Sequence, residues 1–473
     1  MSPPPLRTSV LIVGAGPTGL VLALWLTHLG VAVRIVDKAS APGQASRAVV
    51  VQARILELYR PLGLDQPILA AGHKVAAANF WVRGRRAARA RLGTIDQDLS
   101  PYPDVFIYPQ DEHERLLEAA LLARGVSVER GVAMGTFTQD GAGVSATVGG
   151  RAFWAEYLVG CDGAHSVVRE AVAGAFPGGT YERLVGTVRD AAADPAHLTF
   201  ADVSRAALEG IGVEVLRVNW FSAYRVHHRV AAAFRNRRAF LAGDAAHIHS
   251  PVGGQGMNTG IGDAINLAWK LAAVLQGRAG EGVLDTYDPE RRAFALRLVA
   301  TTDRAFTAAT SPSALARTLR TRVFPTLAAL GSRLPAIRTL MFRTVSQIAI
   351  AYRGQALSSG AAGRVRGGDR LPWVRTPTGD NFEGLDQRRW SLVAHGEAPA
   401  GLAAWCDGAG VTFHAHPWSN AAGAAGLQRG AAYLLRPDSY VALAGAGSGP
   451  ELDRYFAERG MTPAPAASLQ KIG

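Results

Sequence analysis

The sequence predicts an α/β protein in which a Rossmann-like dinucleotide-binding domain is the main unit. Residues 10–13 are apolar and meet a glycine-rich turn, a helical pattern follows to about Leu29, and residues 31–36 again have the composition of a strand. This order is the start of a βαβ unit. Two later glycine-containing segments also follow apolar strand-like runs, and a length of 473 residues fits two or three domains.

The composition is that of a globular protein and argues against several other classes. Apolar residues make up 48% of the chain and charged residues 19%. The net charge of +12 comes mainly from scattered arginines, which favours contact with the anionic groups of a cofactor over a nucleic-acid partner. Cys161 and Cys406 are the only cysteines, so neither a disulfide framework nor a cysteine-based metal site is expected.

The uncharged stretch at residues 8–33 raises the question of a membrane span. Gly14, Gly16, Pro17 and Gly19 interrupt it, and its second half has the pattern of a new strand, so we expect no span. The start of the chain also lacks the pattern of a signal peptide. We therefore expect a soluble, cytoplasmic protein with no membrane or nucleic-acid partner and no metal site.

The first segment, residues 14–19 (G-A-G-P-T-G), has the spacing of a dinucleotide-binding turn. Gly14 would permit the tight turn, Gly16 the approach of a pyrophosphate, and Gly19 the packing of the helix on the strand. The helix N-terminus would face the phosphates. Asp37 ends the second strand, where an acid can accept hydrogen bonds from ribose hydroxyls, which favours FAD or NAD over NADP as the tightly held ligand.

The second and third segments also follow strand-like runs. Residues 160–169 read G-C-D-G-A-H-S-V-V-R and residues 240–247 read F-L-A-G-D-A-A-H, followed by P-V-G-G-Q-G-M-N at residues 251–258. Asp162 alone could be a turn acid, and Asp244 alone a helix N-cap. In this order, however, Asp244 is placed to bind a ribityl chain, and the helix after Gly256 to stabilise negative charge on a flavin ring.

The three segments together resemble the group A FAD-dependent aromatic hydroxylases, the para-hydroxybenzoate hydroxylase family. The branch that acts on aromatic polyketides and rifamycins is the most similar. The likeness extends to residues 46–54 (S-R-A-V-V-V-Q-A-R), 109–117 (P-Q-D-E-H-E-R-L-L), 266–271 (N-L-A-W-K-L) and 434–442 (L-L-R-P-D-S-Y-V-A). The last stretch resembles the thioredoxin-like C-terminal domain of that branch. Because this chain lacks a redox cysteine pair there, we expect the domain to serve packing or assembly.

The resemblance divides the chain into four parts. Residues 1–175 would form the first part of the FAD-binding domain, residues 176–235 a shortened β-sheet middle domain for substrate, residues 236–360 the second part of the FAD-binding domain with long helices, and residues 361–473 the thioredoxin-like domain. Asp162 and Asp244 are 82 residues apart, which is short for this family. Residues 364–377, rich in Gly, Arg and Pro, are expected to be a linker.

The resemblance also assigns roles to individual residues. Arg47 would lie beside the flavin and Gln110 near its ribityl-phosphate region, although a solvated loop charge and a helix cap are the alternatives. The general base candidates are Tyr224, His227 and His228, each of which could instead be structural. The expected sets are as follows: catalytic, Arg47, Tyr224 and Pro251; substrate-binding, Trp81, Trp220 and Tyr224; cofactor-binding, Gly14, Gly16, Pro17, Thr18, Gly19, Asp37, Lys38, Arg47, Gln110, Asp162, Asp244, Pro251, Gly254, Gly256, Met257 and Asn258.

The implied reaction is hydroxylation of a polycyclic aromatic, polyketide-type substrate. NADPH or NADH would serve as the transient reductant of FAD, and dioxygen would react through a flavin hydroperoxide. Two alternatives stay open: Baeyer–Villiger-type oxygen insertion on a similar substrate, and a flavin-binding protein that has lost oxygenase activity. A homodimer is the candidate assembly.

Overall fold

The computed structural model describes residues 5–43, 50–82, 85–91, 98–174, 183–184, 225–226, 229–248, 254–310, 313, 318–323, 327, 331 and 334–463. The expected βαβ start is confirmed: β1 (Leu6–Val13) leads into α1 (Pro17–His28) and then β2 (Val33–Asp37). β1 pairs in parallel with β2 on one side and with β11 (Arg151–Gly160) on the other. Residues 10–13 of β1 are buried because both faces of the sheet are covered.

The large sheet continues on both sides of β1. Its order is β15-β16-β11-β1-β2-β8, with β15 (Arg235–Asn236), β16 (Ala239–Leu241) and β8 (Val128–Arg130). The strands from β16 to β8 are parallel, and β15 is antiparallel to β16. β9 (Met134–Gln139) and β10 (Val144–Val148) extend β11 as an antiparallel meander. Gly149 and Gly150 form the turn between β10 and β11.

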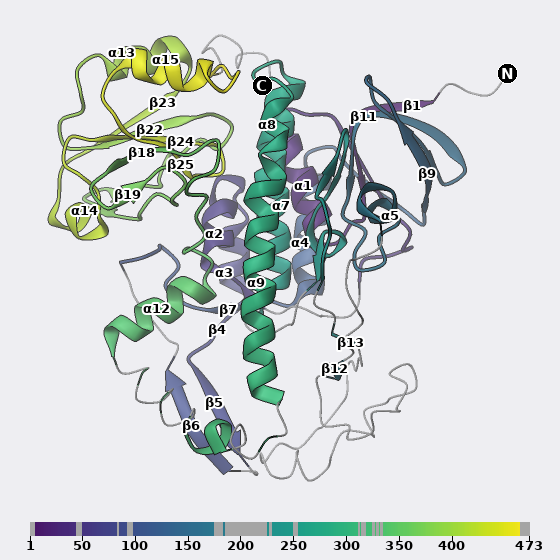
Figure 1. Ribbon diagram of the computed structural model, residues 1–473, viewed down its shortest axis with the longest axis horizontal. Helices are drawn as coiled ribbons and strands as arrows, with labels where there is room; N and C mark the ends of the chain where they lie inside the picture. The colour runs from purple at the N-terminus through teal and green to yellow at the C-terminus, as the bar shows by residue number, and fades with distance from the viewer. Residues whose placement is uncertain are drawn as a thin grey trace.

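Helix α1 packs against both α4 (Gln110–Leu122) and α7 (Gly256–Leu275) beside this sheet. In Figure 1 they lie between the large sheet and the C-terminal sheet. The long helices expected within residues 236–360 are confirmed for the described residues, as α7, α8 (Gly282–Asp285), α9 (Tyr287–Thr310), the π-helix η6 (Leu319–Val323) and α12 (Pro335–Val345). These helices place the end of α12 near the start of α7.

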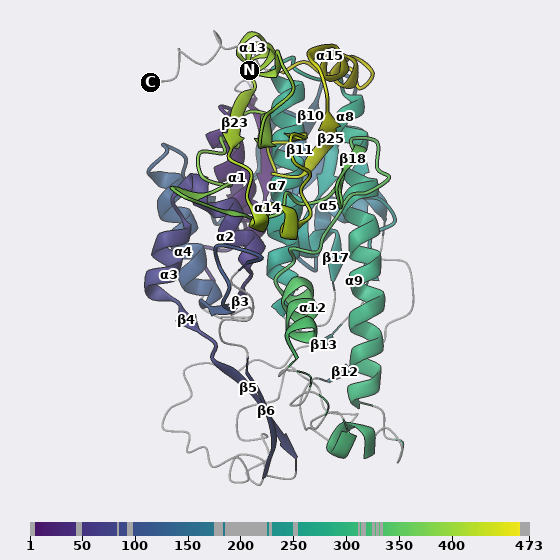
Figure 2. The same cartoon turned by 90° about the vertical axis from the view of Figure 1, so that its left-hand side faces the viewer.

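Short elements complete the N-terminal region. The hairpin of β5 and β6 extends away from the body at the end opposite α13 and α15, as both views show (Figures 1 and 2). β12 and β13 are what the structure describes of the predicted middle domain before residue 229. The bounds are β3 (Val50–Val51), α2 (Ala53–Tyr59), η1 (Arg60–Leu62), α3 (Asp65–Ala71), β4 (His73–Lys74), β5 (Ala77–Val82), β6 (Arg85–Arg91), β7 (Phe106–Ile107), α5 (Val167–Ala173), β12 (Arg183–Leu184), β13 (Arg225–Val226), β14 (Arg229–Val230), η4 (Gly243–Ala245) and β17 (His247–Ile248).

The C-terminal region forms a second sheet with the order β19-β18-β25-β24-β22-β23. Its chain path after β19 and the small β20–β21 pair is β22, α13, β23, α14, β24, β25, α15. Helices α13 and α15 lie on one face of the sheet and α14 on the other (Figure 1). The bounds are β18 (Ser359–Ala362), β19 (Val365–Arg366), β20 (Arg375–Thr376), β21 (Gly379–Asp380), β22 (Ser391–His395), α13 (Leu402–Ala409), β23 (Thr412–His416), α14 (Asn420–Ala425), β24 (Ala432–Leu435), β25 (Val441–Ala446) and α15 (Gly449–Ala457).

The expected linker at residues 364–377 is wrong. β19 begins at Val365 and belongs to the C-terminal sheet. Leu371, Trp373 and Val374 are buried in the core of that region. The Gly, Arg and Pro content is typical of a linker, but here it serves tight turns between buried side chains.

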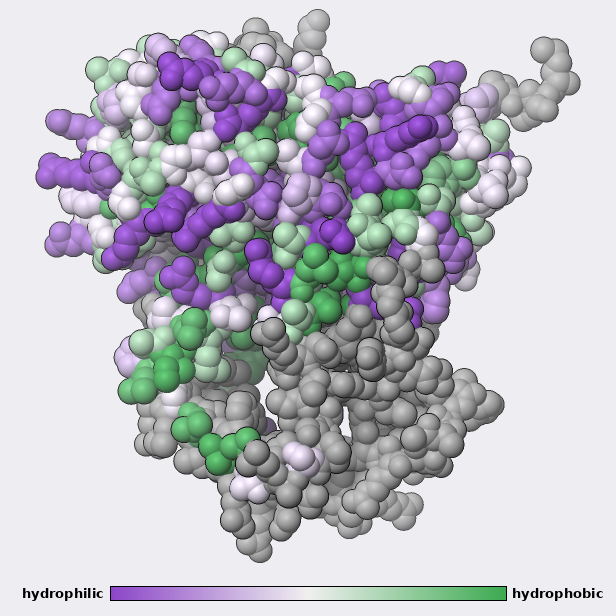
Figure 3. All heavy atoms as spheres, viewed as in Figure 1, coloured by the Kyte–Doolittle hydropathy of each residue, from purple (hydrophilic) through white to green (hydrophobic). Residues whose placement is uncertain are grey.

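Apolar side chains remain exposed around α12. Among the described residues, most of the large exposed apolar side chains fall between residues 319 and 341, including Leu334, Ile337, Leu340 and Met341. Figure 3 shows apolar surface where α12 lies. An apolar face of this kind marks a place where an apolar ligand or a partner can bind.

Candidate functional site

The first glycine-rich segment forms a tight turn between β1 and α1. Gly14 has a φ of 102°, and a Cβ atom on it would lie 2.3 Å from the carbonyl oxygen of Cys161. A Cβ atom on Gly19 would lie 1.9 Å from the carbonyl oxygen of Gly14. At Gly16, in contrast, no described atom lies within 4 Å of the Cβ position, and no side chain caps the helix that follows. Pro17 has no N–H group, so the free N–H groups of the first turn of α1 begin at Thr18, beside open space where a phosphate could bind.

The acid at the end of β2 is fixed by two backbone donors. Asp37 accepts hydrogen bonds from the N–H of Ala15 at 2.6 Å and from the N–H of Ala39 at 2.7 Å, and Lys38 beside it is exposed. Because Ala15 belongs to the glycine turn, the carboxylate lies next to the first segment. This is where a ribose-binding acid is expected.

Glu114 is a neighbour of this acid that the sequence analysis missed. It accepts from the side chain of Gln110 at 2.8 Å and from the N–H of Gly43 at 3.3 Å. Burial raises the pKa of Glu114, and the negative charge of Asp37 acts in the same direction. Gln110, at the start of α4, thus has a buried partner one helical turn away. The spacing of four residues between Gln110 and Glu114 is the sequence feature that could have indicated this pair.

The second segment contacts the first. Asp162 follows β11, and its Cα atom would lie 2.8 Å from a Cβ on Gly14. One carboxylate oxygen accepts from the N–H of Val167 at 2.9 Å, while Oδ1 is buried without a hydrogen-bond partner in the described part of the chain. Burial raises the pKa of Asp162. An unpartnered buried oxygen at this edge of the sheet is a polar atom that a bound cofactor can satisfy.

The third segment also meets the first, through Thr18. Gly243 has a φ of 62°, and a Cβ on it would lie 2.6 Å from Oγ1 of Thr18. A Cβ on Gly260 of α7 would lie 2.4 Å from the same oxygen. Asp244 follows in the η4 turn and is exposed. Since β16, β11 and β1 are parallel neighbours, their carboxyl ends bring all three segments to one edge of the sheet.

The start of α7 is tied to β3 by Asn258. Its side chain accepts from the N–H of Gln52 at 2.9 Å and donates to the carbonyls of Val50 and Gly254, both at 2.8 Å. Asn258 is fully buried, whereas Met257 and Gly256 are half-buried. The side chain of Asn258 is thus bonded to the protein backbone at Val50, Gln52 and Gly254. Its predicted role in cofactor binding would be exerted through this backbone, which it holds in place.

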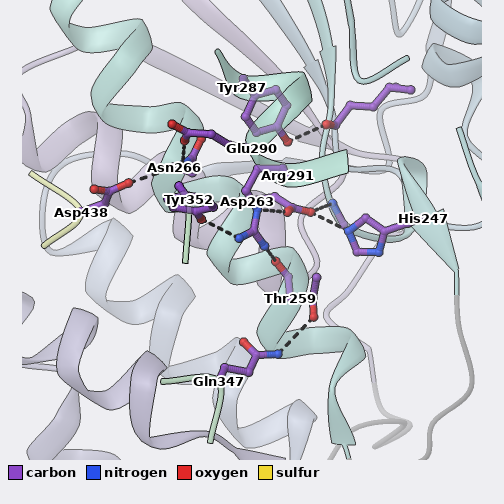
Figure 4. Close-up of polar contacts among 12 residues, drawn as sticks. His247, Thr259, Asp263, Asn266, Tyr287, Glu290, Arg291, Gln347, Tyr352 and Asp438 are labelled. Atoms are coloured by element: carbon purple, nitrogen blue, oxygen red, sulfur yellow. Dashed lines mark hydrogen bonds and ion pairs between the residues drawn. The ribbon is translucent and has the colours of Figure 1, made fainter. Parts of the chain in front are cut away.

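A buried polar cluster lies behind the third segment, and most of its residues carry no functional signal in the sequence. Asp263 accepts from Nε2 of His247 at 2.7 Å, from Nε of Arg291 at 2.6 Å and from the N–H of Gly243 at 3.0 Å. Figure 4 shows its carboxylate between the side chains of Arg291 and His247. Burial alone would raise the pKa of Asp263, but Arg291 and His247 hold it below its usual value. An acid within the apolar pattern of residues 261–268 was the only local signal.

The end of α12 contacts the start of α7 through two buried glutamines. Gln255 donates to the carbonyl of Val345 at 3.0 Å, and Gln347 donates to the side chain of Gln255 at 2.7 Å. Gln347 has a φ of 63°. This left-handed conformation costs a non-glycine residue of order 1 kcal/mol, which its buried hydrogen bonds offset. The C-terminal end of α12 is thereby held next to the start of α7.

Several predicted residues cannot be placed at the site. Arg47, Trp220, Tyr224, His227, His228 and Pro251 lie outside the described residues, and Trp81 lies in β5. Their roles stay predictions. In the part of the chain that the structure describes, no group of three or more His, Cys, Asp or Glu side chains is arranged to hold a metal ion. The described helices include none that is long and apolar enough to cross a membrane.

The comparisons with known proteins agree with this geometry. The family described as "FAD binding domain" matches residues 7–208 and 180–302. 6-Methylpretetramide 4-monooxygenase of Streptomyces rimosus is 35% identical over 399 residues, which cover 74% of this chain and 69% of the relative. The dialkyldecalin synthase of Streptomyces rugosporus is 32% identical, covering 84% of this chain and 95% of the relative. The solved structure of OxyS anhydrotetracycline hydroxylase from Streptomyces rimosus matches with a TM-score of 0.75 at 27% identity, covering 97% of this chain and all of that chain.

The parallel sheet, the glycine cradle and the acids at its edge define an α/β flavoprotein that binds FAD. The chain belongs to the FAD-binding-domain family of group A aromatic hydroxylases, in its polyketide monooxygenase branch.

Proposed function

We propose that this protein is an FAD-dependent monooxygenase that hydroxylates a polycyclic aromatic substrate of the polyketide type, with NADPH or NADH as the transient reductant. The observation that carries the proposal is the meeting of the three glycine-containing segments at one edge of the large sheet, next to the N-terminus of α1. Relatives named as monooxygenases of tetracycline-type compounds support the substrate class.

The described residues fit the parts of FAD in order. The turn at Gly14 and Gly16 and the start of α1 would hold the pyrophosphate, and Asp37 the adenosine ribose. Asp244 would accept hydrogen bonds from the ribityl hydroxyls, and the N-terminus of α7 would stabilise negative charge on the pyrimidine part of the ring. When bound and reduced, FAD supplies the activation of dioxygen.

The substrate side of the proposal rests on apolar surface. The helix α12 carries exposed apolar residues, and its C-terminal end contacts the start of α7, where Gln255 donates to the carbonyl of Val345. Burial of a flat polycyclic aromatic against such a face would be favourable and would exclude water. We propose that Trp81, Trp220 and Tyr224 also contact the substrate, that Tyr224 acts as general base, and that Arg47 and Pro251 flank the flavin.

The test uses the purified protein with its own flavin. We expect an oxidised flavin spectrum, faster reduction by NADPH or NADH when an aromatic polyketide phenol is present, and one oxygenated product for each dioxygen consumed. Labelled dioxygen and mass spectrometry would identify hydroxylation, and a lactone or ester product would indicate Baeyer–Villiger-type insertion instead. Peroxide formation without product, for every aromatic polyketide tried, would contradict the proposal.

A second candidate function is a flavin-binding cyclase without net oxygenation. The observation that favours it is the likeness to dialkyldecalin synthase over 95% of that relative's length. A cyclase of this kind would convert its substrate without dioxygen or NAD(P)H, so anaerobic turnover of a polyene substrate at unchanged mass distinguishes it from the monooxygenase.

We also propose that the C-terminal region is thioredoxin-like and serves packing. The β-α-β-α-β-β-α path and the central order β25-β24-β22-β23 support this assignment. Cys406 is buried and unpaired, so a thiol redox role is not part of it. A homodimer in the cytoplasm, with no nucleic-acid or membrane partner, completes the proposal.

A further inference from the structure

Asp263 is a fully buried acid on α7, on a helix that is otherwise mainly apolar. A buried carboxylate is costly unless nearby donors satisfy it. Here both oxygens are satisfied: Oδ2 accepts from Gly243 and His247, and Oδ1 accepts from Arg291. Because a carboxylate only accepts, Nε2 of His247 must be the donor in this pair.

The partners of Asp263 come from both ends of the turn that carries Asp244. Gly243 opens the η4 turn and His247 lies just beyond it. The turn cannot shift inward, since Gly243 already packs against Thr18 with no room for a Cβ atom. The turn is therefore held on one side by the carboxylate of Asp263 and on the other side by Thr18 of α1.

Arg291 connects this arrangement to the rest of the molecule. Besides Asp263, its guanidinium donates to the carbonyl of Thr259 at 3.1 Å and to the hydroxyl of Tyr352 at 2.8 Å. These bonds hold α9 to α7 next to the turn, as Figure 4 shows. The Asp263 side chain is thus held by a partner that is itself fixed at two further points, Thr259 and Tyr352.

We propose that Asp263 is a positioning residue for FAD, because it holds the turn that presents Asp244 to the ribityl chain against Thr18 at the start of α1. The inference rests on the cofactor roles given to Asp244 and to the start of α1, where Thr18 lies, in the proposed function. It adds that one buried carboxylate sets the distance between the first and third cofactor segments. Loss of that carboxylate would move both segments and weaken FAD binding.

Glu290, which precedes Arg291 in α9, provides a matched control. Its carboxylate is buried to the same degree and accepts from Lys270 at 2.9 Å and from Arg436 at 2.7 Å. Its hydrogen-bond partners in the described part of the chain are Asn266, Lys270 and Arg436, and none of these belongs to a cofactor segment. Glu290→Gln should therefore lower stability, as Asp263→Asn does, without moving the η4 turn.

The experiment is a titration of flavin-free protein with FAD in which binding is monitored by flavin fluorescence. Circular dichroism measures the folded fraction of each variant. We expect Asp263→Asn to raise the FAD dissociation constant by about tenfold or more, and Glu290→Gln to change it by less than about twofold. An unchanged dissociation constant in Asp263→Asn, or an equal change in both variants, would overturn the proposal.

A second pair of variants covers the case in which Asp263→Asn does not fold. His247→Gln keeps an N–H donor for Asp263, whereas His247→Phe keeps the ring and removes the donor. Weaker FAD binding in the Phe variant alone is expected, and equal binding in both would overturn the proposal. The titration requires neither NAD(P)H nor aromatic substrate. A wild-type protein that binds FAD but does not oxygenate would therefore contradict the proposed function and leave this inference standing.

Discussion

Glycine serves two different physical needs within the first segment. Gly14 and Gly19 are required by the protein itself, because a side chain at either position would overlap backbone atoms of the neighbouring turn. Gly16 has an ordinary φ of −75° and open space where a side chain would lie. Its need for glycine thus comes from the cofactor, which must approach the backbone there.

This difference predicts opposite outcomes for two alanine variants. Gly16→Ala should keep the melting temperature of the flavin-free protein and lose FAD affinity, since the methyl group would occupy the space of the pyrophosphate. Gly19→Ala should lower the melting temperature of the flavin-free protein itself, because overpacking reduces the free energy of unfolding by about 1–3 kcal/mol. Thermal unfolding without FAD and an FAD titration would separate the two. A Gly16→Ala variant that binds FAD as the wild type does would contradict the prediction.

The candidate site was predictable where residue type and spacing carry the chemistry. Gly14, Asp37, Asp162 and Asp244 stand next to strand ends, and the structure places all four at one sheet edge. Asp263 and Arg291 could not be found in this way, since their partnership joins positions 28 residues apart on two helices. The sequence shows only an acid inside an apolar helix, and its partners depend on how the helices pack.

At the scale of elements, local periodicity predicted β1, α1, β2 and α7. It failed at residues 364–377, where long-range contacts decide the structure. Arg370 forms a buried ion pair with Glu57, 313 residues away, at 2.5 Å. Strand β18, just before this stretch, pairs with β25, which follows more than 70 residues later. Neither pairing has a local signal in the sequence.

The pairing of β22 with β23 brings histidines together inside the C-terminal region. His395 lies opposite His416 in the parallel register, and their ring centroids are 5.0 Å apart. His395 is buried, and neither of its ring nitrogens has a hydrogen-bond partner within the described part of the chain. Burial, with a smaller contribution from His416, lowers the pKa of His395 from 6.5 to about 4.

These strands should therefore lose stability in acid. Between pH 6.5 and 4 the unfolded chain takes up a proton at His395 that the folded chain does not, so the free energy of unfolding falls as the pH drops. The full effect is about 3 kcal/mol for this histidine. His395→Leu should remove this part of the pH dependence, as measured by urea unfolding at pH 7 and pH 4.5. Burial also lowers the pKa values of His28 and His113 to about 4, and the contributions of these two histidines to the pH dependence would remain in the variant.

A variant of the exposed His73, His73→Gln, is the control for this measurement. It should follow the wild-type pH dependence. An equal loss of stability in acid for His395→Leu and for the wild type would show that His395 is not the group responsible.

At the scale of the whole molecule, the C-terminal region and the FAD-binding region share a buried ion network. Arg436, in the stretch after β24, pairs with Glu290 of α9 and with Asp438, and its guanidinium lies 5.2 Å from the ring of Trp269. Asp438 also accepts from the indole N–H of Trp269 at 3.1 Å. Each region thus supplies charges that the other needs inside its core.

Removal of Arg436 should cost far more than removal of a surface charge. Arg436→Met leaves Glu290 with Lys270 and Asp438 without its guanidinium partner, which predicts a loss of about 3–5 kcal/mol in the free energy of unfolding. Arg115→Met, which breaks an exposed pair with Asp111 on α4, should cost less than about 1 kcal/mol. Denaturant unfolding of both variants gives the comparison, and similar losses would contradict the buried network.

The same network predicts that the two regions fold as one unit. A chain that ends at residue 356 would lack Arg370, Arg436 and Asp438, so Glu57, Glu290 and the indole of Trp269 would lose partners inside the remaining core. It would also expose the apolar side chains that pack against the C-terminal sheet, among them Trp269 on Trp390. We expect this truncated chain to bind no FAD and to lack a cooperative thermal transition. A chain that ends at residue 463 keeps these partners and should bind FAD and unfold cooperatively. Flavin fluorescence and calorimetry on the two chains provide the measurement. A chain ending at residue 356 that binds FAD and unfolds cooperatively would mean that the C-terminal region is an independent attachment, and its buried charges would then need another explanation.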